Sequence, residues 1–210
     1  MNSLISCLGN KDLLDEVGRL RYRAYTAAKA IPHNDDEIFL DNYDEKENCI
    51  SFLYKIDNTS VGSIRANIHS SKNGWLPTAA SEIYTEEIKV ALGANTPYIE
   101  SNRFAVIPDY GISERKLFFG LFKAIGLITL IEEAEFVITA VREHHAPFYR
   151  RKLGFNVISN AKTYFGLNTP MVLLAGNVKK EIKPIWDANK ELSITDRDFW
   201  TYKTCGKIEL

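Results

Sequence analysis

The sequence predicts an α/β domain in which strands and helices are joined by mixed connections. Three observations indicate this class: short apolar runs alternate with helical patterns, two strand-like runs flank a turn in the N-terminal half, and one long apolar helix separates later strands. We expect a single domain over residues 1–210, with a core over about 4–175 and a C-terminal helix and tail over 176–210.

The composition is that of an ordinary globular protein. Hydrophobic residues make up 45% and aromatic residues 11%, and 26 basic side chains nearly balance 27 acidic ones. The aromatic content argues against disorder, and the lack of a basic excess argues against a general nucleic-acid binder. No secretory signal is apparent, and the most apolar run, Leu117–Ile131, is too short for a membrane span and is interrupted by Lys123. Three cysteines without metal-ligand spacing, Cys7, Cys49 and Cys205, favour a reducing, cytoplasmic compartment.

The elements of the N-terminal half follow from capping and turn chemistry. We expect a short strand at Leu4–Leu8, a helix at Lys11–Ala28 capped by Asn10, an acidic loop at Ile31–Glu47, and a hairpin of Cys49–Ile56 and Val61–His69. The helix carries an apolar stripe at helical spacing, and Asp57, Asn58 and Thr59 supply the turn of the hairpin.

The C-terminal half alternates strands with helices. The predicted elements are a helix at Ala80–Leu92, a strand at Tyr98–Ile107, a helix from a Ser113 cap to about Ala134, a strand at Phe136–Val141, a helix at His144–Leu153 stopped by Gly154, strands at Phe155–Ser159, Thr163–Leu167 and Met171–Ala175, and a helix at Pro184–Leu192. The helix after Ser113 is apolar almost all round, which indicates burial between a sheet and other helices. The tail from Asp196 to Leu210 gives no functional signal.

The predicted strand at Tyr98–Ile107 carries a first candidate site. Glu100 and Arg103 are three residues apart, so a regular strand places them on opposite faces. Both can face one site only where a bulge or sharp twist lies between them, and a bulge would also part this strand from its neighbour and open a slot for an extended ligand. The loop and helix start that follow can hold an anionic group with backbone amides from Ser113 onward and with Arg115 and Lys116.

The segment Phe148–Phe155 carries a second candidate site. Two aromatic residues, the basic run Arg150–Lys152 and a Leu-Gly-Phe turn follow one another. Core packing with a solvated basic face also explains this pattern. The preceding His144 and His145 are adjacent and point in different directions, so no metal site is expected there.

Together these motifs resemble the GNAT acyltransferase superfamily. The resemblance rests on Glu-Ser-Asn-Arg-Phe-Ala-Val at 100–106, the long apolar helix, the strand Val137–Val141, and Phe-Tyr-x-x-x-Leu-Gly-Phe at 148–155. The N-terminal half, with Leu-Arg-Tyr-Arg-Ala-Tyr at 20–25, Leu-Asp-Asn-Tyr-Asp at 40–44 and Gly-Ser-Ile-Arg at 62–65, is similar to acyl-homoserine-lactone synthases and to the related N-acyl amino acid synthase family. The similarity covers about residues 4–175.

This resemblance implies a mixed, mostly antiparallel sheet with splayed central strands and an acyl transfer from a thioester to an amine. The implied catalytic residues are Glu100 as general base and Tyr149 as the group that protonates the leaving thiolate. The implied donor site comprises Arg103, Phe104, Ala105, Val106, Ser113, Arg115 and Lys116, and the implied acceptor pocket is ordered by Arg21, Asp41, Asp44 and Arg65. A backbone amide near Phe104–Val106 is the expected oxyanion donor. Structural alternatives stay open: an ion-pair partner for Glu100, a packed ring for Tyr149, and solvated loop carboxylates for Asp41 and Asp44.

Two departures from the relatives bear on the substrates. Ile31 stands near the place of a tryptophan in the lactone synthases, which favours an amino acid acceptor. The loop Pro108–Ile112 holds a single glycine where acetyl-CoA-dependent members are glycine-rich, which favours an acyl-carrier protein as donor over acyl-CoA. No permanently bound cofactor is expected. Basic residues at 115–116 and 150–152 are expected to face the acidic carrier protein.

Three alternatives stay open from the sequence. One is a lactone synthase that uses S-adenosylmethionine as acceptor, and another is an acetyl-CoA-dependent N-acetyltransferase. The third is a degenerate module that binds acyl groups without turnover, against which the retention of both Glu100 and Arg103 argues.

Overall fold

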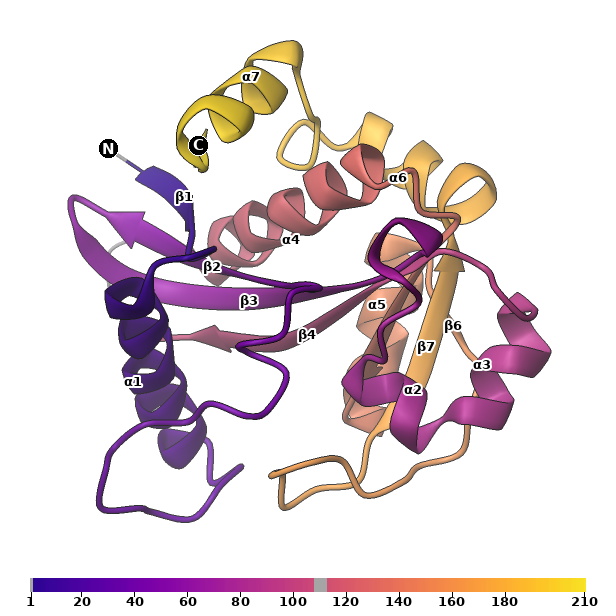
Figure 1. Ribbon diagram of the computed structural model, residues 1–210, viewed down its shortest axis with the longest axis horizontal. Helices are drawn as coiled ribbons and strands as arrows, with labels where there is room; N and C mark the ends of the chain where they lie inside the picture. Colours follow the sequence, from indigo (N-terminus) through magenta and orange to yellow (C-terminus); the bar gives the residue numbers. More distant parts are fainter. Residues whose placement is uncertain (1, 108–112) are drawn as a thin grey trace.

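The computed structural model describes residues 2–107 and 113–210 (Figure 1). The loop Pro108–Ile112, from which the donor was predicted, lies outside the described residues. Within the described residues the strands are β1 (Asn2–Ser6), β2 (Cys49–Ile56), β3 (Thr59–His69), β4 (Tyr98–Val106), β5 (Phe136–Val141), β6 (Asn156–Val157), β7 (Val172–Asn177) and β8 (Lys207–Glu209). The α-helices are α1 (Lys11–Ala27), α2 (Ala79–Ile83), α3 (Thr85–Leu92), α4 (Glu114–Ile131), α5 (Ala146–Leu153), α6 (Lys183–Ala188) and α7 (Asp196–Cys205).

The described strands form one mixed sheet in the order β6-β7-β5-β4-β3-β2-β1-β8. β4 and β5 pair in parallel, and the other neighbouring strands described pair antiparallel. The predicted fold class, a GNAT-like sheet flanked by helices, is therefore confirmed. None of the described helices is long and apolar enough to cross a membrane.

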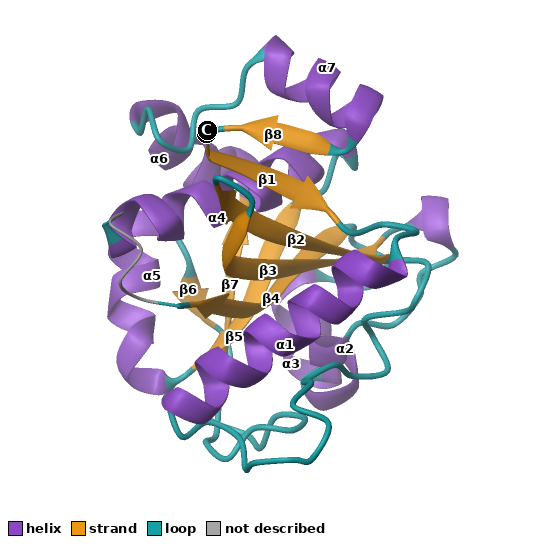
Figure 2. Ribbon diagram, turned by 90° about the vertical axis from the view of Figure 1, so that its left-hand side faces the viewer, coloured by secondary structure: helices purple, strands orange, loops and turns teal. Residues whose placement is uncertain are grey.

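Helices cover both faces of this sheet, and α1 and α4 lie on opposite sides of it (Figure 2). The alternation of side chains along β2 shows why both faces need cover. Phe52 packs in the core cluster that contains α4, and Leu53 packs with Val17 and Leu20 of α1 on the other face. The nearly all-apolar α4 is accordingly buried along most of its length.

The predicted capping residues of three helices are confirmed, although α4 ends at Ile131 and not near Ala134. The side chains of Asn10 and Ser113 cap α1 and α4, accepting from the backbone N–H groups of Leu13 and Lys116. Gly154 ends α5 at φ +77°, in the left-handed region that favours glycine.

Three regions differ from the prediction. The helix expected at Ala80–Leu92 is two helices that meet at Tyr84, whose buried hydroxyl donates to the carbonyl of Met171 at 2.5 Å. The strand expected at Thr163–Leu167 does not form, and that segment runs as a loop between the bridged residues Lys162 and Met171.

The third difference concerns the C-terminal segment. The residues without a predicted role form α7 and β8, and β8 adds to the sheet beside β1. A π-helix at Val178–Ile182 also precedes α6, where no element was predicted.

Candidate active site

A bulge in β4 sets the direction of the β4 side chains at the site. Ser63 pairs with Ala105 and Arg65 with Asn102, so β4 has one residue more than β3 between these pairs. Arg103 occupies the bulge at φ +52°, an uncommon conformation for a residue with a side chain. The bulge inverts the alternation: Ala105 packs toward α1, and Phe104 packs toward α4. Of the two conditions under which Glu100 and Arg103 could face one site, a bulge or a sharp twist, the structure has the bulge.

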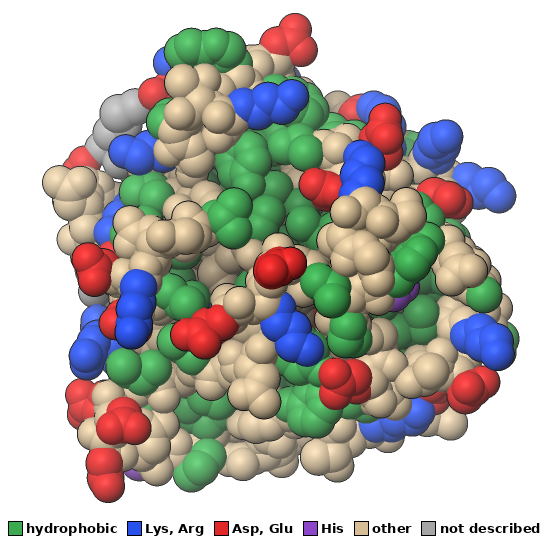
Figure 3. Space-filling model, in the orientation of Figure 1, with side chains coloured by type: hydrophobic (Ala, Val, Ile, Leu, Met, Phe, Trp, Pro, Cys, Tyr) green, Lys and Arg blue, Asp and Glu red, His purple; other side chains and the backbone are tan. Residues whose placement is uncertain are grey.

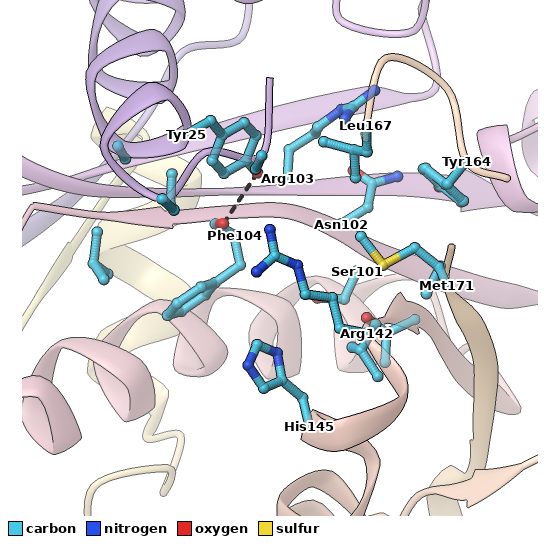
Figure 4. Close-up of a pocket in the computed structure, with 18 of the residues that line it drawn as sticks. Tyr25, Ser101, Asn102, Arg103, Phe104, Arg142, His145, Tyr164, Leu167 and Met171 are labelled. Carbon is cyan, nitrogen blue, oxygen red and sulfur yellow. Dashed lines mark hydrogen bonds between the residues drawn. The ribbon is translucent and has the colours of Figure 1, made fainter. Parts of the chain in front are cut away.

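The bulge accompanies a separation of β4 from β5. The two strands pair from Tyr98 to Glu100 on β4, and both continue beyond that point without pairing to each other. A cavity of about 330 Å³ occupies the gap, lined by residues of α1, β4, β5 and α5 and by Tyr164, Leu167 and Met171. In Figure 4, His145 and Arg142 reach toward this cavity from one side, and Asn102 and Tyr164 lie on the other.

A buried ion-pair network lies on the α1 side of the sheet. Arg21 donates to Asp44 at 2.7 Å and to the Ser51 hydroxyl at 3.0 Å. Arg65 lies between the two aspartates, with Nη1 at 2.6 Å from Asp41 and at 3.0 Å from Asp44. The structure thus brings together the four residues that were predicted to order the acceptor pocket.

The Arg103 side chain joins the same network. Its Nε and Nη2 atoms lie 2.8 Å and 2.6 Å from Asp41 Oδ2, and Nη2 also donates to the carbonyl of Phe165 at 3.0 Å. Arg103 was predicted to bind the donor, but its guanidinium holds the Asp41 loop and the Tyr164–Leu167 loop together. Its backbone still lines the cavity.

The network fixes the charges of its carboxylates. Burial acts to raise the pKa of Asp41, but the Arg65 and Arg103 guanidinium groups outweigh it and hold that pKa well below its usual range. The pKa of Asp44 is lowered in the same way, by Arg21 and Arg65 against burial. Both aspartates are therefore ionised at neutral pH, and neither is a solvated loop carboxylate.

Asn102 connects this network to Glu100. Its amide oxygen accepts from Arg65 Nε at 2.7 Å, and its amide nitrogen donates to Glu100 Oε1 at 2.7 Å. Glu100 is fully buried, and its second oxygen accepts from the backbone N–H of Ala80 at 2.8 Å. The Tyr164 hydroxyl also donates to Glu100 Oε1, at 2.5 Å. Both carboxylate oxygens of Glu100 are thus occupied by protein donors.

Tyr149, the predicted acid, lies across the cavity in a cluster of rings. It lines the cavity from α5 and packs edge-on against Phe118, Phe122 and Phe155. Burial raises its pKa above the usual value, so the hydroxyl keeps its proton at neutral pH.

Three of the predicted donor residues, Phe104, Val106 and Arg115, line a second cavity, of about 830 Å³, between α4, α5 and α6. It shares Phe104 and Val106 with the first cavity, and its other lining residues include the basic Arg115, Arg151 and Lys152. The exposed Arg115 pairs with Glu191, with 3.2 Å between Nε and Oε2. The backbone N–H of Lys116 donates to the hydroxyl of Ser113, which caps α4.

Several residues of the site were not singled out from the sequence. Tyr25 donates to the carbonyl of Phe104 at 3.0 Å and so pins the bulge to α1 (Figure 4). It lies one helical turn after Arg21, and Asn102 lies two residues after Glu100 on the same strand face, so helix and strand periodicity could have found both. No sequence signal marks Tyr164, because only tertiary contacts bring its loop to Glu100.

Comparisons with known proteins define the class of this chain. A family model described as N-acyl amino acid synthase FeeM matches residues 16–177. The structure of FeeM, an N-acyl amino acid synthase from uncultured soil microbes, is 18% identical, covers 86% of this chain and 92% of its own, and has a TM-score of 0.68. The acyl-homoserine-lactone synthase LasI is 16% identical over 94% of this chain and 98% of its own, with a TM-score of 0.69.

A third similar structure is the CoA-dependent acyl-homoserine lactone synthase BjaI, solved with S-adenosylmethionine and isopentyl-CoA. It is 14% identical over 90% of this chain and 89% of its own, with a TM-score of 0.64. No curated protein sequence matches this chain closely.

The splayed strands, the flanking helices and the family match define a GNAT-type N-acyltransferase. The chain belongs to the FeeM family of N-acyl amino acid synthases. The predicted family resemblance and enzyme class are thereby confirmed.

Proposed function

We propose that the protein transfers a medium or long acyl chain from an acyl-carrier protein to the α-amine of an amino acid. The observation that carries the proposal is a run of adjoining cavities centred on the gap between β4 and β5. The first cavity shares Phe104 and Val106 with the cavity at α4 and α5, and shares Tyr164 and Leu167 with a third cavity on the opposite side.

The cavity at α4 and α5 suits a phosphopantetheine that enters from a carrier protein. Its inner walls are apolar, with Phe104, Phe118 and Phe119, and basic Arg151 and Lys152 stand at its exposed edge. Carrier proteins are acidic, so these charges support docking at this mouth. The acyl chain would lie against the β4 bulge and the apolar part of the first cavity.

The third cavity suits the acceptor amino acid. Its volume is about 760 Å³, and it lies between the segment 31–39 and the loop 163–168. Arg103 joins these two segments, because its guanidinium carbon lies 4.9 Å from the centroid of the Phe39 ring and its Nη2 donates to the carbonyl of Phe165. An acceptor here would present its amine to the thioester carbon at the β4 bulge.

The chemistry needs a proton acceptor for the amine and donors for the tetrahedral oxyanion. Glu100 is the proposed proton acceptor, acting through its hydrogen-bonded neighbours because its carboxylate is fully buried. Backbone amides in Phe104–Val106 are the proposed oxyanion donors, and Tyr149 is the proposed acid for the thiolate.

The test is a product-mass experiment. The purified protein is incubated with dodecanoyl- or octanoyl-acyl-carrier protein and a mixture of the common amino acids, and new masses are read by mass spectrometry. We expect one or a few N-acyl amino acids. Matched reactions replace the carrier protein with acyl-CoA or acetyl-CoA, and the amino acids with S-adenosylmethionine.

Each arm decides one part of the proposal. An acyl-homoserine lactone that forms only with S-adenosylmethionine overturns the amino acid acceptor. Turnover with acyl-CoA that exceeds turnover with the carrier protein overturns the donor. A preference for acetyl-CoA overturns the long acyl chain.

A further inference from the structure

Glu100 is separated from the space in which the substrates would meet. Its side chain is fully buried, and it lines neither the central cavity nor the two cavities that adjoin it. Two of its hydrogen-bond partners, Asn102 and Tyr164, do line the central cavity, and both bind the same carboxylate oxygen. A proton that moves from the cavity to Glu100 must therefore pass through one of these two groups or through water.

Tyr164 is the better of these two groups for proton transfer. A phenol hydroxyl has one proton to give and lone pairs that can accept another, whereas the Asn102 amide nitrogen is a donor only. The Asn102 amide is also engaged at three partners: Arg65, Asn67 and Glu100. The Tyr164 hydroxyl makes its hydrogen bond to Glu100 at 2.5 Å, within the range of charge-assisted O–H···O⁻ bonds.

Tyr164 also stands where donor and acceptor would meet. It lines both the central cavity and the cavity proposed for the acceptor. Two contacts fix the position of Tyr164. The guanidinium carbon of Arg103 lies 5.9 Å from the centroid of the Tyr164 ring, and the Tyr164 carbonyl accepts from the backbone N–H of Leu167 at 3.1 Å. The nearby Lys162–Met171 bridge anchors the start of its loop.

We propose that Tyr164 is a catalytic residue that takes a proton from the acceptor amine while it passes its own proton to Glu100. This inference rests on the proposed function for the nature of the acceptor, and it holds for any amine that the enzyme acylates. Glu100 then acts as the base at the far end of a two-proton relay.

The proton balance of the relay is complete. The neutral amine attacks the thioester carbon, a C–N bond forms, and the carbonyl electron pair moves to oxygen. One N–H bond of the adduct breaks as its proton moves to the Tyr164 oxygen, and the Tyr164 proton moves to Glu100 Oε1. The oxyanion re-forms the carbonyl, and the C–S bond breaks, with its electron pair leaving on the thiolate. The thiolate takes the proton of Tyr149, the acid proposed above, and Tyr149 regains a proton from the solvent. Glu100 returns its proton through Tyr164 to the solvent, so no net proton is gained or lost.

The electrostatics favour a relay in which both protons move together. Burial, together with the neighbouring Glu100 carboxylate, raises the pKa of Tyr164 well above its usual value. The hydroxyl therefore holds its proton at neutral pH. In a concerted relay it need not ionise, because it gains one proton as it gives up the other.

The main test compares Tyr164→Phe with the control Tyr84→Phe. Tyr84 is also buried and also loses one hydrogen bond, to the Met171 carbonyl, but it lines none of the cavities described here. We expect Tyr164→Phe to lower kcat by about 10²-fold or more, with little change in KM, and Tyr84→Phe to change kcat by less than about threefold. Thermal unfolding of both variants checks that they are folded.

A second measurement separates the relay from a purely structural role. In the wild type, kcat plotted against the deuterium content of the solvent should bow downward, because two protons move in one step. In Tyr164→Phe the plot should become linear. The double variant Tyr164→Phe/Glu100→Gln should be no slower than the slower single variant, since both changes break the same relay.

The outcomes distinguish this inference from the proposed function. The assay uses the donor and acceptor that give product in the mass experiment, including S-adenosylmethionine or acetyl-CoA, so a wrong substrate overturns the proposed function and leaves the relay testable. A kcat of Tyr164→Phe close to wild type, an unchanged isotope plot, or multiplicative effects in the double variant would overturn the relay. Absence of product with every donor and acceptor overturns both.

Discussion

At the scale of single residues, the site is a chain of buried charges with alternating sign. Arg21, Asp44, Arg65, Asp41 and Arg103 follow one another by contacts of 2.6 to 3.0 Å, and Asn102 extends the chain to Glu100. A buried charge is tolerated only when it is paired and hydrogen-bonded, so removal of one member leaves its partners exposed to the full desolvation penalty. The network therefore makes the α1 side of the site sensitive to single substitutions.

Asp41 offers a direct test of this sensitivity. Its folded-state pKa is depressed below the ordinary value of 3.8, so its contribution to stability is full above that pH and is lost as the pH falls toward the folded pKa. We expect Asp41→Asn to lower the free energy of unfolding by about 3 kcal/mol at pH 7. The variant should also lose less stability than the wild type as the pH falls from about 4 to about 2. Urea denaturation at several pH values measures both effects.

The control for this prediction is Asp187→Asn, which breaks the exposed pair between Asp187 and Lys183. An exposed pair contributes less than about 1 kcal/mol, so this variant should unfold much like the wild type. Equal losses in the two variants would show that burial does not strengthen the Asp41 pairs.

At the scale of elements, the sequence predicted the helix ends that depend on bonds between residues close together in the chain. Asn10, Ser113 and Gly154 mark helix ends through bonds within a few residues, and each was found from the sequence. The break at Tyr84 and the loop around Tyr164 depend on partners far along the chain, Met171 and Glu100, which no local pattern contains. The site shows the same contrast between local and distant contacts. The three-residue separation of Glu100 and Arg103 raised a bulge in β4 as one way for both to face one site. The direction of the Arg103 side chain, however, depends on the fold of the distant Asp41 loop.

Substitution of Gly154 tests how much the stability of the protein depends on the glycine that ends α5. A Cβ at this position would lie 2.6 Å from the Glu181 carbonyl oxygen, and the backbone would stay in the left-handed region. Gly9 has a similar φ, +68°, but a Cβ there meets nothing within 4 Å. We expect Gly9→Ala to lower stability by about 1 kcal/mol through strain alone, and Gly154→Ala to lower it by about 3 kcal/mol through strain and clash. Equal losses in thermal or urea unfolding would contradict a close approach between α5 and the π-helix.

At the scale of the whole molecule, the near-zero net charge conceals a difference between regions in how charged side chains are placed. Acidic and basic side chains intermingle over the face shown in Figure 3. On the α1 side of the sheet, charged residues are buried and paired with one another, as in the Arg21–Asp44 pair. Beside the cavity at α4 and α5, Arg150, Arg151 and Lys152 are exposed. Buried charges thus order the site, whereas these basic charges stay exposed beside the cavity at α4 and α5.

The final prediction concerns this exposed group. Arg151→Glu combined with Lys152→Glu should weaken binding of an acyl-carrier protein by about tenfold or more at low salt, and the difference from wild type should shrink as salt screens the charges. Turnover of an acyl-pantetheine, which carries the thioester without phosphate or protein, should fall much less, because the inner walls of the cavity at α4 and α5 are apolar and these two exposed side chains stand at its edge. The matched control, Lys11→Glu with Lys89→Glu, makes the same change in net charge on exposed residues of α1 and α3. Equal weakening in the control would attribute the effect to net charge, and a salt-independent loss would place the carrier protein elsewhere on the surface.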